Sequence, residues 1–295
     1  MNRVLIYGGL GNQMFQYALN TALNQKGGKS KILFSNFFYD DYHNGFNLKQ
    51  AFKLKLPFPS ILYSFILMHG GLLYKNKIAA YFFRKLITKY RKKKYTIYTE
   101  KVEFLYDETV FHKTSSLLIG VWQVEAYFKD ISEIIRREFL FKKPKDARNR
   151  KLIQEINTCN SVSIHIRRGD YLTSKRTELF TVFKNETYYI NAIDYINKRI
   201  ENPHYYIFSD DIQWVKENLK IANCTFVDHN KGKNSYIDMY LMSLCKHNII
   251  ANSTFSWWGG WLNNNKNKMV IIPECWLNTK DCPGIYPSEW IKMGV

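Results

Sequence analysis

The sequence is poor in cysteine. Its 295 residues include five, at positions 159, 224, 245, 275 and 282, an odd number with no C-x-x-C pair among them. Zinc sites and redox dithiols recur at such close spacings, so this pattern supports neither kind of motif. Reduced thiols in a cytosolic protein are the remaining expectation.

Long apolar runs are also missing. The longest, Ile61–Tyr74, is shorter than the roughly 20 residues that span a bilayer, and a glycine pair interrupts it. The opening residues MNRVLIYGGLGNQMF have a glycine-rich turn where a signal peptide would have its apolar stretch. We therefore expect a soluble cytoplasmic protein, with a peripheral contact at the inner face of the membrane left open.

Acidic residues are the third shortage. The 25 Asp and Glu residues are outnumbered by 43 Lys and Arg, which leaves a formal net charge of +18. Such an excess attracts polyanions without naming one: nucleic acid, an anionic membrane and an acidic small substrate all fit. Part of it lies in Lys89–Lys94 (KYRKKK), which a solvated helix face or loop explains equally well.

What the chain does have is 46% apolar residues, enough for a large core. Short β-rich runs alternate with helical stretches, which predicts βαβ units and parallel sheets. The expected strands are residues 4–7, 31–34, 117–121, 161–166, 205–208, 224–227, 248–251 and 269–272. We also expect helices over 60–90 and 126–139, and a domain crossover in the polar stretch 142–151. Ligands of parallel sheets bind at the carboxyl ends of the strands, where the motifs below lie.

The first motif, Gly8–Gln13 (GGLGNQ), follows the first strand and opens a helix. Its flexible backbone amides at a helix start suit an anion or a sugar hydroxyl, and a tight turn that needs glycine is the plain alternative. A dinucleotide fingerprint is disfavoured, because Met14 stands where the third glycine would be.

The second motif, His165–Tyr171 (HIRRGDY), lies at the end of the strand 161–166. Guanidinium groups are costly to bury unpaired, but Arg167 and Arg168 suit a diphosphate, whose growing charge they would neutralise. His165 could bind a base or a phosphate, and Asp170 could orient an arginine or accept a proton. A surface Arg–Asp ion pair is the alternative reading.

The third motif, Ser209–Asp211 (SDD), follows the strand 205–208. Its aspartates could bind a metal, accept hydrogen bonds from a guanine edge or cap the next helix, with Ser209 or Asp210 as the cap. No D-x-D triplet occurs anywhere in the chain, so a metal-dependent nucleotide-sugar site is not indicated.

The fourth motif, Asn252–Trp261 (NSTFSWWGGW), follows the strand 248–251. Hydroxyls and free amides at a helix start form a cradle for phosphate, whereas the tryptophans are expected to pack in the core. Together the motifs predict a diphosphate site without a metal, and the residues alone identify neither nucleotide nor sugar.

In their order, five blocks resemble the bacterial α-1,2-fucosyltransferases of glycosyltransferase family 11. They are residues 8–18, 120–128, 163–171, 207–212 and 251–263. The resemblance implies an α/β fold of the GT-B type, with two Rossmann-like domains whose parallel sheets face a cleft. We expect an acceptor-side domain over residues 1–154 and a GDP-fucose-binding domain over residues 155–295.

The resemblance also implies a reaction. L-fucose would pass from GDP-β-L-fucose, with inversion and without metal or other cofactor, to the 2-hydroxyl of a galactose in a surface polysaccharide or O-antigen type of glycan. Whether that acceptor is lipid-linked stays open. In distant relatives the first arginine of the basic block engages the donor diphosphate, which corresponds to Arg167.

The site residues follow from this resemblance. Arg167 and Asp170 are the catalytic candidates, with the base itself unassigned. The expected donor-binding residues are His165, Arg167, Arg168, Asp210, Asp211, Ser253, Thr254, Phe255 and Ser256. The expected sugar or acceptor side comprises Gly11, Asn12, Gln13, Trp122 and Gln123. Val124 departs from the serine of many members, which bears on the acceptor and not on the donor.

Two other classes of protein stay open at this point. A nucleic-acid-binding protein would use the charge and the aromatics, but the chain has no helix-turn-helix, RRM or zinc-finger signature, so we expect no nucleic-acid partner. A non-catalytic glycan-binding module would need no diphosphate site.

Overall fold

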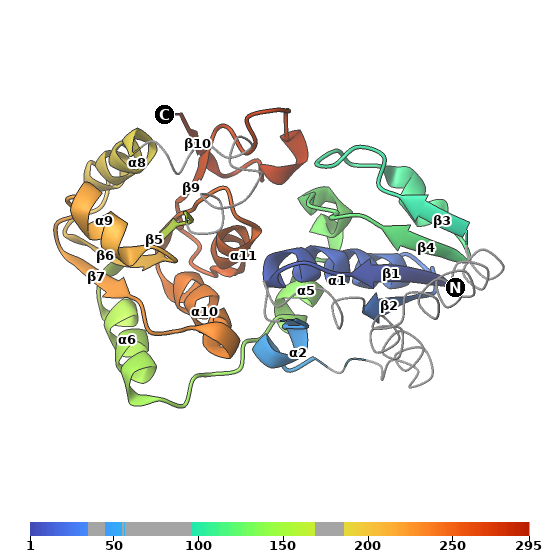
Figure 1. The fold of residues 1–295 in the computed structure, drawn as a ribbon, viewed down its shortest axis with the longest axis horizontal. Coiled ribbons are helices and arrows are strands. Elements are labelled where there is room, and N and C mark those ends of the chain that lie inside the picture. The colour runs from blue at the N-terminus through green and yellow to red at the C-terminus, as the bar shows by residue number, and fades with distance from the viewer. Residues whose placement is uncertain (35–44, 55, 57–95, 169–185, 295) are drawn as a thin grey trace, which may run out of the picture. The chain divides into compact units, whose positions relative to one another are not determined.

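The computed structural model describes residues 1–34, 45–54, 56, 96–168 and 186–294. They form two compact units, Met1–Leu140 and Phe141–Val295 (Figure 1). The predicted helical stretch 60–90, the KYRKKK run and Asp170 lie outside the described residues. No helix within the described ranges is long and apolar enough to cross a membrane.

The first unit is built on a parallel four-stranded sheet. Its strands are β1 (Asn2–Ile6), β2 (Ser30–Phe34), β3 (Thr96–Thr99) and β4 (Ser116–Ile119), in the order β2-β1-β4-β3. Helix α1 (Leu10–Gln25) connects β1 to β2 and buries an apolar stripe that includes Met14, Phe15, Ala18 and Leu19. Side chains at i, i+1, i+4 and i+5 share one helix face, so α1 covers the sheet along its length.

Short elements complete this unit: α2 (Leu48–Ala51), η3 (Glu108–His112), η4 (Glu125–Tyr127), η5 (Lys129–Ile131) and α5 (Ser132–Glu138). The single helix predicted over 126–139 is wrong. Phe128, at φ −134°, leaves the helical region between η4 and η5. Its ring is buried 6.0 Å from that of Phe15 in α1, and this packing replaces the continuous helix.

The second unit has a parallel six-stranded sheet in the order β10-β9-β8-β5-β6-β7. Its strands are β5 (Asn160–Ile166), β6 (Pro203–Ser209), β7 (Cys224–Val227), β8 (His247–Ile249), β9 (Val270–Pro273) and β10 (Ile291–Met293). Its helices are α6 (Ala147–Thr158), α8 (Thr187–Asn197), α9 (Ile212–Asn218), α10 (Tyr236–Leu244) and α11 (Thr254–Leu262), with the short turns η8 (Gly232–Asn234) and η9 (Pro283–Ile285).

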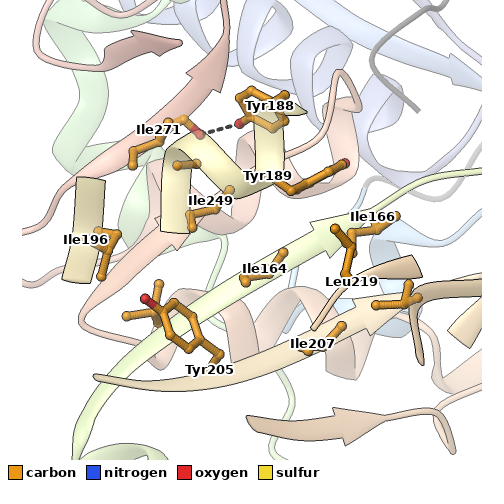
Figure 2. Packing of buried hydrophobic residues seen from close by; sticks show 13 residues of the cluster. Ile164, Ile166, Tyr188, Tyr189, Ile196, Tyr205, Ile207, Leu219, Ile249 and Ile271 are labelled. Carbon is orange, nitrogen blue, oxygen red and sulfur yellow. Dashed lines mark hydrogen bonds between the residues drawn. The ribbon is translucent and has the colours of Figure 1, made fainter. Parts of the chain in front are cut away.

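Alternation along the strands divides this core into two faces. Tyr205 and Ile207 of β6 pack with residues of α8 and α9, whereas Tyr206 and Phe208 pack with residues of α6 and α10. Figure 2 shows the first of these clusters, in which the Tyr188 hydroxyl donates a 3.1 Å hydrogen bond to the Ile271 carbonyl. Helices therefore cover both faces of the sheet, as the continuous apolar runs of buried parallel strands require.

The α/β class with two parallel-sheet units is confirmed. The units divide between Leu140 and Phe141, whereas the boundary drawn from sequence, between residues 154 and 155, falls inside α6. Only Leu152, Ile156 and Asn149 of α6 are buried, so its polar sequence resembles a linker. The arrangement of the two sheets about a cleft stays a prediction.

Candidate functional site

Three of the four motifs meet at one edge of the second sheet. Strand β5 lies between β8 and β6, and the motifs follow the carboxyl ends of these three neighbours. The register pairs His165 with Phe208 and Ile166 with Ser209, so the arginines and the aspartates leave the sheet side by side. Parallel β5, β6 and β8 therefore bring together residues that are far apart in the sequence.

The arginines are paired with the aspartates of the next strand. Arg167 Nε lies 3.2 Å from Asp210 Oδ2, and the other oxygen of Asp210 accepts the Arg168 backbone N–H at 2.8 Å. Arg168 Nε lies 3.5 Å from Asp211 Oδ2. Asp211 also caps α9 by accepting the Trp214 backbone N–H, so the cap is Asp211 and not Ser209 or Asp210 as expected. Asp210 thus holds the Arg167 side chain and the Arg168 backbone, and Asp211 holds the Arg168 side chain.

The two arginines differ in exposure. The Arg168 side chain is 11% exposed and its guanidinium lies 3.6 Å from the ring centre of Trp214, whereas the Arg167 side chain is 31% exposed. Stacking on an aromatic face fixes the plane of a guanidinium. Arg167 is therefore the more accessible cation of the pair. Trp214 was missed from sequence, although it follows the paired aspartates in the first turn of α9.

His165 is buried at the end of β5. Burial, and to a smaller extent the nearby Arg167, lowers the pKa of its imidazole to about 3, so the ring is neutral at pH 7. Its ring centre lies 5.8 Å from that of Phe255, and its Nδ1 has no hydrogen-bond partner among the described residues. A neutral, enclosed imidazole with an unused nitrogen can hydrogen-bond a ligand without adding charge.

The fourth motif forms the start of α11. Ser253 is its N-cap, and the Ser253 hydroxyl accepts the Phe255 backbone N–H at 3.4 Å. The hydroxyl of fully buried Ser256 is directed to the carbonyls of Ala251 and Ser253, at 3.4 and 3.3 Å. The start of the helix is thus partly exposed at Thr254 and Phe255, while Ser256 supports it from within.

The three tryptophans of this motif belong to the core, as expected. Trp257, Trp258 and Trp261 are at most 2% exposed, and the Trp257 indole N–H donates to the Ile285 carbonyl at 2.7 Å. Burial of these large aromatics stabilises the helix, and their mutual edge and stacked contacts add to it.

A further polar cluster at this edge was missed from sequence. After β7, Asn230 donates to Asp238 of α10 at 2.7 Å, and it exchanges hydrogen bonds with the buried Asn149 of α6. Burial raises the pKa of Asp238 to about 8, against the lowering effect of Asn230. Asp238 therefore holds a carboxyl that can be a proton donor near neutral pH. The only signal in the sequence is a single aspartate in an apolar helix.

In the first unit, the glycine motif turns the chain from β1 into α1. Gly8 has φ +77°, and a Cβ there would lie 2.9 Å from Asn12 Nδ2. Gly11 is buried in the first turn of α1. Gln13 is fully buried: its amide N–H groups donate to the carbonyls of Gly8 and Gly45, and its oxygen accepts the Asn47 N–H. Gln13 therefore connects the turn at Gly8 to residues 45–47. Asn12, in contrast, is partly exposed.

The predicted acceptor-side residues after β4 lie beside this turn. The Gln123 amide donates to Asn12 Oδ1 at 2.9 Å, so two residues separated by 111 positions are in contact. Trp122 is fully buried and has φ +55°, a conformation uncommon for a bulky side chain. Val124 is buried as well, so the variable position faces the core.

The second unit thus carries cations and a helix start that can bind a diphosphate, and the first carries an amide pair at a strand end. Among the described residues no group of three or more His, Cys, Asp or Glu side chains is placed to hold a metal ion. The five cysteines, all described, are free thiols.

The sequence is similar to a family of glycosyltransferases and to two full-length bacterial relatives. Residues 65–293 match the model of glycosyl transferase family 11. The chain is 32% identical over 297 residues to an alpha-1,2-colitosyltransferase of Escherichia coli, covering 97% of this chain and 96% of the relative. It is 29% identical to the O-antigen biosynthesis glycosyltransferase WbnK of Escherichia coli, over 97% of this chain and 98% of WbnK.

More distant likenesses are partial or weak. The human galactoside alpha-(1,2)-fucosyltransferase 1 is 26% identical over 145 residues, 46% of this chain and 40% of the human protein. A NodZ alpha-1,6-fucosyltransferase soaked with GDP-fucose superposes with a TM-score of 0.49 at 13% identity, over 88% of this chain and 91% of NodZ. The family model and the full-length relatives carry the assignment: this chain is a glycosyltransferase and belongs to glycosyl transferase family 11.

Proposed function

We propose that this enzyme is a galactoside α-1,2-fucosyltransferase that moves L-fucose from GDP-β-L-fucose to the 2-hydroxyl of a galactose in a glycan. The observation that carries the proposal is the Arg167–Arg168 pair, held by Asp210 beside the start of α11, in a family 11 chain. The α-1,2 linkage in the names of two relatives supports the regiochemistry.

The proposed reaction is a displacement with inversion. The acceptor hydroxyl would attack C1 of fucose on the face opposite GDP, and the C1–O bond to the β-phosphate would break. Arg167, with its guanidinium oriented by Asp210, would offset the charge that grows on the departing phosphate, and the amides at the start of α11 would assist. The base is unassigned, because Asp170 lies outside the described residues.

The second unit supplies the remaining donor contacts in this proposal. His165 is neutral and enclosed, which suits a hydrogen bond to the base or phosphate of GDP. Asp210 and Asp211 act through the arginines they pair with, and Asp211 also anchors α9. The acceptor would meet Asn12 and Gln123 of the first unit.

The direct test is an assay of the purified full-length chain with GDP-fucose and a panel of galactose-terminated oligosaccharides, with the product linkage read by NMR. We expect an α-linked fucose on the galactose 2-hydroxyl. Transfer to another hydroxyl, or transfer from other nucleotide sugars only, would overturn the proposal.

A second donor needs testing because the full-length relative at 32% identity is a colitosyltransferase. Colitose is fucose without its 3-hydroxyl, so a site that hydrogen-bonds that hydroxyl would discriminate strongly and an apolar site would not. Running GDP-fucose and GDP-colitose in parallel, and comparing kcat/KM, decides which sugar this enzyme uses.

We also propose that the reaction needs no metal, since the paired arginines supply the countercharge. Activity should persist in excess EDTA. A loss that Mg²⁺ or Mn²⁺ restores would show that the arginines are insufficient.

Membership in a glycosyltransferase family weakens the two other classes that the sequence left open, a nucleic-acid-binding protein and a non-catalytic glycan-binding module. Calorimetry with GDP and a gel shift with duplex DNA complete the comparison. We expect the enzyme to bind GDP in calorimetry, and we expect no DNA complex in the gel that survives added salt.

Finally, we propose that the enzyme contacts an anionic membrane peripherally, where a lipid-linked acceptor would lie. The +18 charge supports this proposal, since each Lys or Arg near such a surface contributes about 1 kcal/mol within a Debye length of about 8 Å. Co-sedimentation with anionic and neutral vesicles across a salt series tests it. Equal binding to both kinds of vesicle, or none at low salt, would contradict it.

A further inference from the structure

The loop after β4 adopts a conformation that needs an explanation. Trp122 is fully buried at φ +55°, and its indole N–H has no hydrogen-bond partner among the described residues. Left-handed backbone at a bulky residue is strained and persists only where the surroundings enforce it. Such strain recurs at binding and catalytic sites, where neighbouring groups hold the backbone in place.

The enforcing group is the carboxylate of Glu100. One of its oxygens, Oε2, accepts the backbone N–H groups of both Val121, at 2.7 Å, and Trp122, at 3.1 Å. Two successive amides that converge on one anionic oxygen form a nest, and hydrogen bonds to a charged acceptor are the strong kind. Glu100 directly follows β3, whose register with β4 pairs Thr99 with Ile119.

Gly120 makes the approach possible. A Cβ on Gly120 would lie 2.6 Å from Glu100 Cβ and 2.7 Å from its Oε2, closer than real Cβ contacts allow. The Gly120 carbonyl in turn accepts the Gln16 amide at 3.2 Å. Glycine at this position therefore lets the carboxylate reach the two amides.

The result is the position of Gln123. With Val121 and Trp122 fixed, the next residue places its amide 2.9 Å from Asn12 Oδ1 of α1, at the carboxyl edge of the sheet. Asn12 is partly exposed and Gln123 is 7% exposed, so Gln123 orients the Asn12 amide from within. Amide groups recognise sugar hydroxyls because each offers donors and an acceptor.

We propose that Glu100 is a positioning residue for acceptor recognition: its carboxylate holds the Gly120–Gln123 loop in the strained form that aligns Gln123 with Asn12. Glu100 acts through the loop and not on the reacting atoms. This inference rests on the proposed acceptor side of the first unit. It predicts that loss of the Glu100 charge weakens acceptor binding and leaves donor binding intact.

The experiment compares four variants of the full-length enzyme: Glu100→Gln, Gln123→Ala, the double variant, and Glu108→Gln as the matched control. Glu108 is an exposed glutamate in the segment between β3 and β4. We measure kcat, KM for the acceptor, KM for the donor and the affinity for GDP by calorimetry. Thermal unfolding monitors the fold.

We expect Glu100→Gln to raise the acceptor KM about tenfold, because hydrogen bonds to a charged acceptor become hydrogen bonds to a neutral one. The donor KM and the GDP affinity should stay within about twofold, as should every parameter of Glu108→Gln. The double variant should be no worse than Gln123→Ala alone, since both changes remove the same alignment.

Each contrary outcome has a distinct meaning. If Gln123→Ala is impaired for the acceptor but Glu100→Gln behaves as wild type, the Glu100 inference fails and the acceptor side stands. If Gln123→Ala is itself unchanged, the proposed acceptor side fails. If the two changes raise the acceptor KM additively in the double variant, Glu100 acts independently of Gln123 and the inference fails. It also fails if Glu100→Gln lowers kcat and shifts the acidic limb of the pH profile of kcat, because Glu100 would then take part in the reaction itself.

If Glu100→Gln does not fold, Glu100→Asp gives the same readout. It keeps the charge but shortens the side chain by one methylene, so the carboxylate no longer reaches both amides. An unchanged acceptor KM in this variant would overturn the inference.

Discussion

At the scale of single residues, one carboxylate organises the basic end of β5. Asp210 contacts the side chain of Arg167 and the backbone of Arg168, so it orients and partly neutralises the Arg167 guanidinium and fixes the backbone beside it. A diphosphate offers a stronger anion to the same cations. The site is thereby preorganised, because Asp210 already orients Arg167 and limits the cost of desolvating its guanidinium.

Arg167→Lys should lower kcat by about 100-fold or more, equivalent to about 2.7 kcal/mol of transition-state stabilisation. Lysine keeps one charge but loses the planar fork that, in the proposed function, meets phosphate oxygens while Asp210 orients it. Steady-state kinetics with GDP-fucose measures the effect. Arg148→Lys is the control, because Arg148 pairs with Asp228 on an exposed surface. Near-native turnover of the Arg167 variant would remove this arginine from catalysis.

Asp238 should make stability fall between pH 7 and 8. Its pKa is about 8 in the folded protein against 3.8 for a free aspartate, so the folded state binds more protons across this interval. The contribution of Asp238 to the free energy of unfolding is greatest below pH 3.8 and is lost as the pH rises through 8. The loss is at most about 1.4 kcal/mol per pH unit. His165 has the opposite sign, but only between its folded pKa of about 3 and 6.5.

Asp238→Asn should therefore reduce the fall of the free energy of unfolding with pH between pH 7 and 8. Asparagine can still accept the hydrogen bond from Asn230. Urea unfolding at pH 7.0, 7.5 and 8.0 measures it. Asp281→Asn, at an exposed carboxylate that does not act on Asp238, should leave the slope unchanged. A wild-type slope in the Asp238 variant would show that this carboxyl is ionised in the folded protein.

At the scale of elements, α11 is placed by glycine packing. Gly260 faces β9 so closely that a Cβ would lie 2.9 Å from Val270 Cγ1, and Gly259 meets Met242 of α10 in the same way. Two glycines in a helix lower its intrinsic stability, which the burial of three tryptophans offsets. The start of α11, with Ser253 as its cap, is positioned by this packing at the carboxyl end of β8.

Gly260→Ala should destabilise the protein by about 1–3 kcal/mol, although alanine gains about 1 kcal/mol in helix preference over glycine. Val270 is β-branched and held in a strand, so it cannot move aside cheaply. Urea unfolding measures the change, and Glu217→Ala on exposed α9 should stay within about 0.5 kcal/mol of wild type. A stabilised Gly260 variant would show that α11 can shift without cost.

At the scale of the whole molecule, the proposed function assigns the donor and the acceptor to separate units. Each unit has its own parallel sheet and its own core, with polar motifs after the carboxyl ends of its strands. A ligand that binds one unit should therefore stabilise that unit first, by about 2.7 kcal/mol at a concentration 100 times its Kd.

Hydrogen exchange with and without saturating GDP tests this division. We expect slower exchange in the second unit at the ends of β5 and β6 and at the start of α11, and little change in β1 and α1. The Arg167→Lys variant should show the same protection at a higher GDP concentration. Protection confined to the first unit would reverse the assignment of donor and acceptor sides.

The sequence by itself determined the class of the fold and the place of the motifs. Apolar runs of four to seven residues alternating with helical stretches depend only on local pattern, and the predicted strands at 161–166, 205–208 and 224–227 are β5, β6 and β7. Three elements with little buried sequence were not predicted, namely β3, β10 and the polar helix α6, which was interpreted in part as a crossover. The tryptophans of α11 were rightly placed in the core, since their size rewards burial.

Only the tertiary structure decided which residues meet. The local sequence pattern does not determine the order of strands in a sheet, so the neighbours of β5 could not be predicted. For the same reason the pairing of Arg167 with Asp210, 43 positions away, could not be predicted. The stacking of Arg168 on Trp214 and the contact of Glu100 with Val121 and Trp122 depend on the same lateral arrangement. Contacts between neighbouring strands arise from how sheets assemble around a core, and therefore the geometry of the site came from the fold.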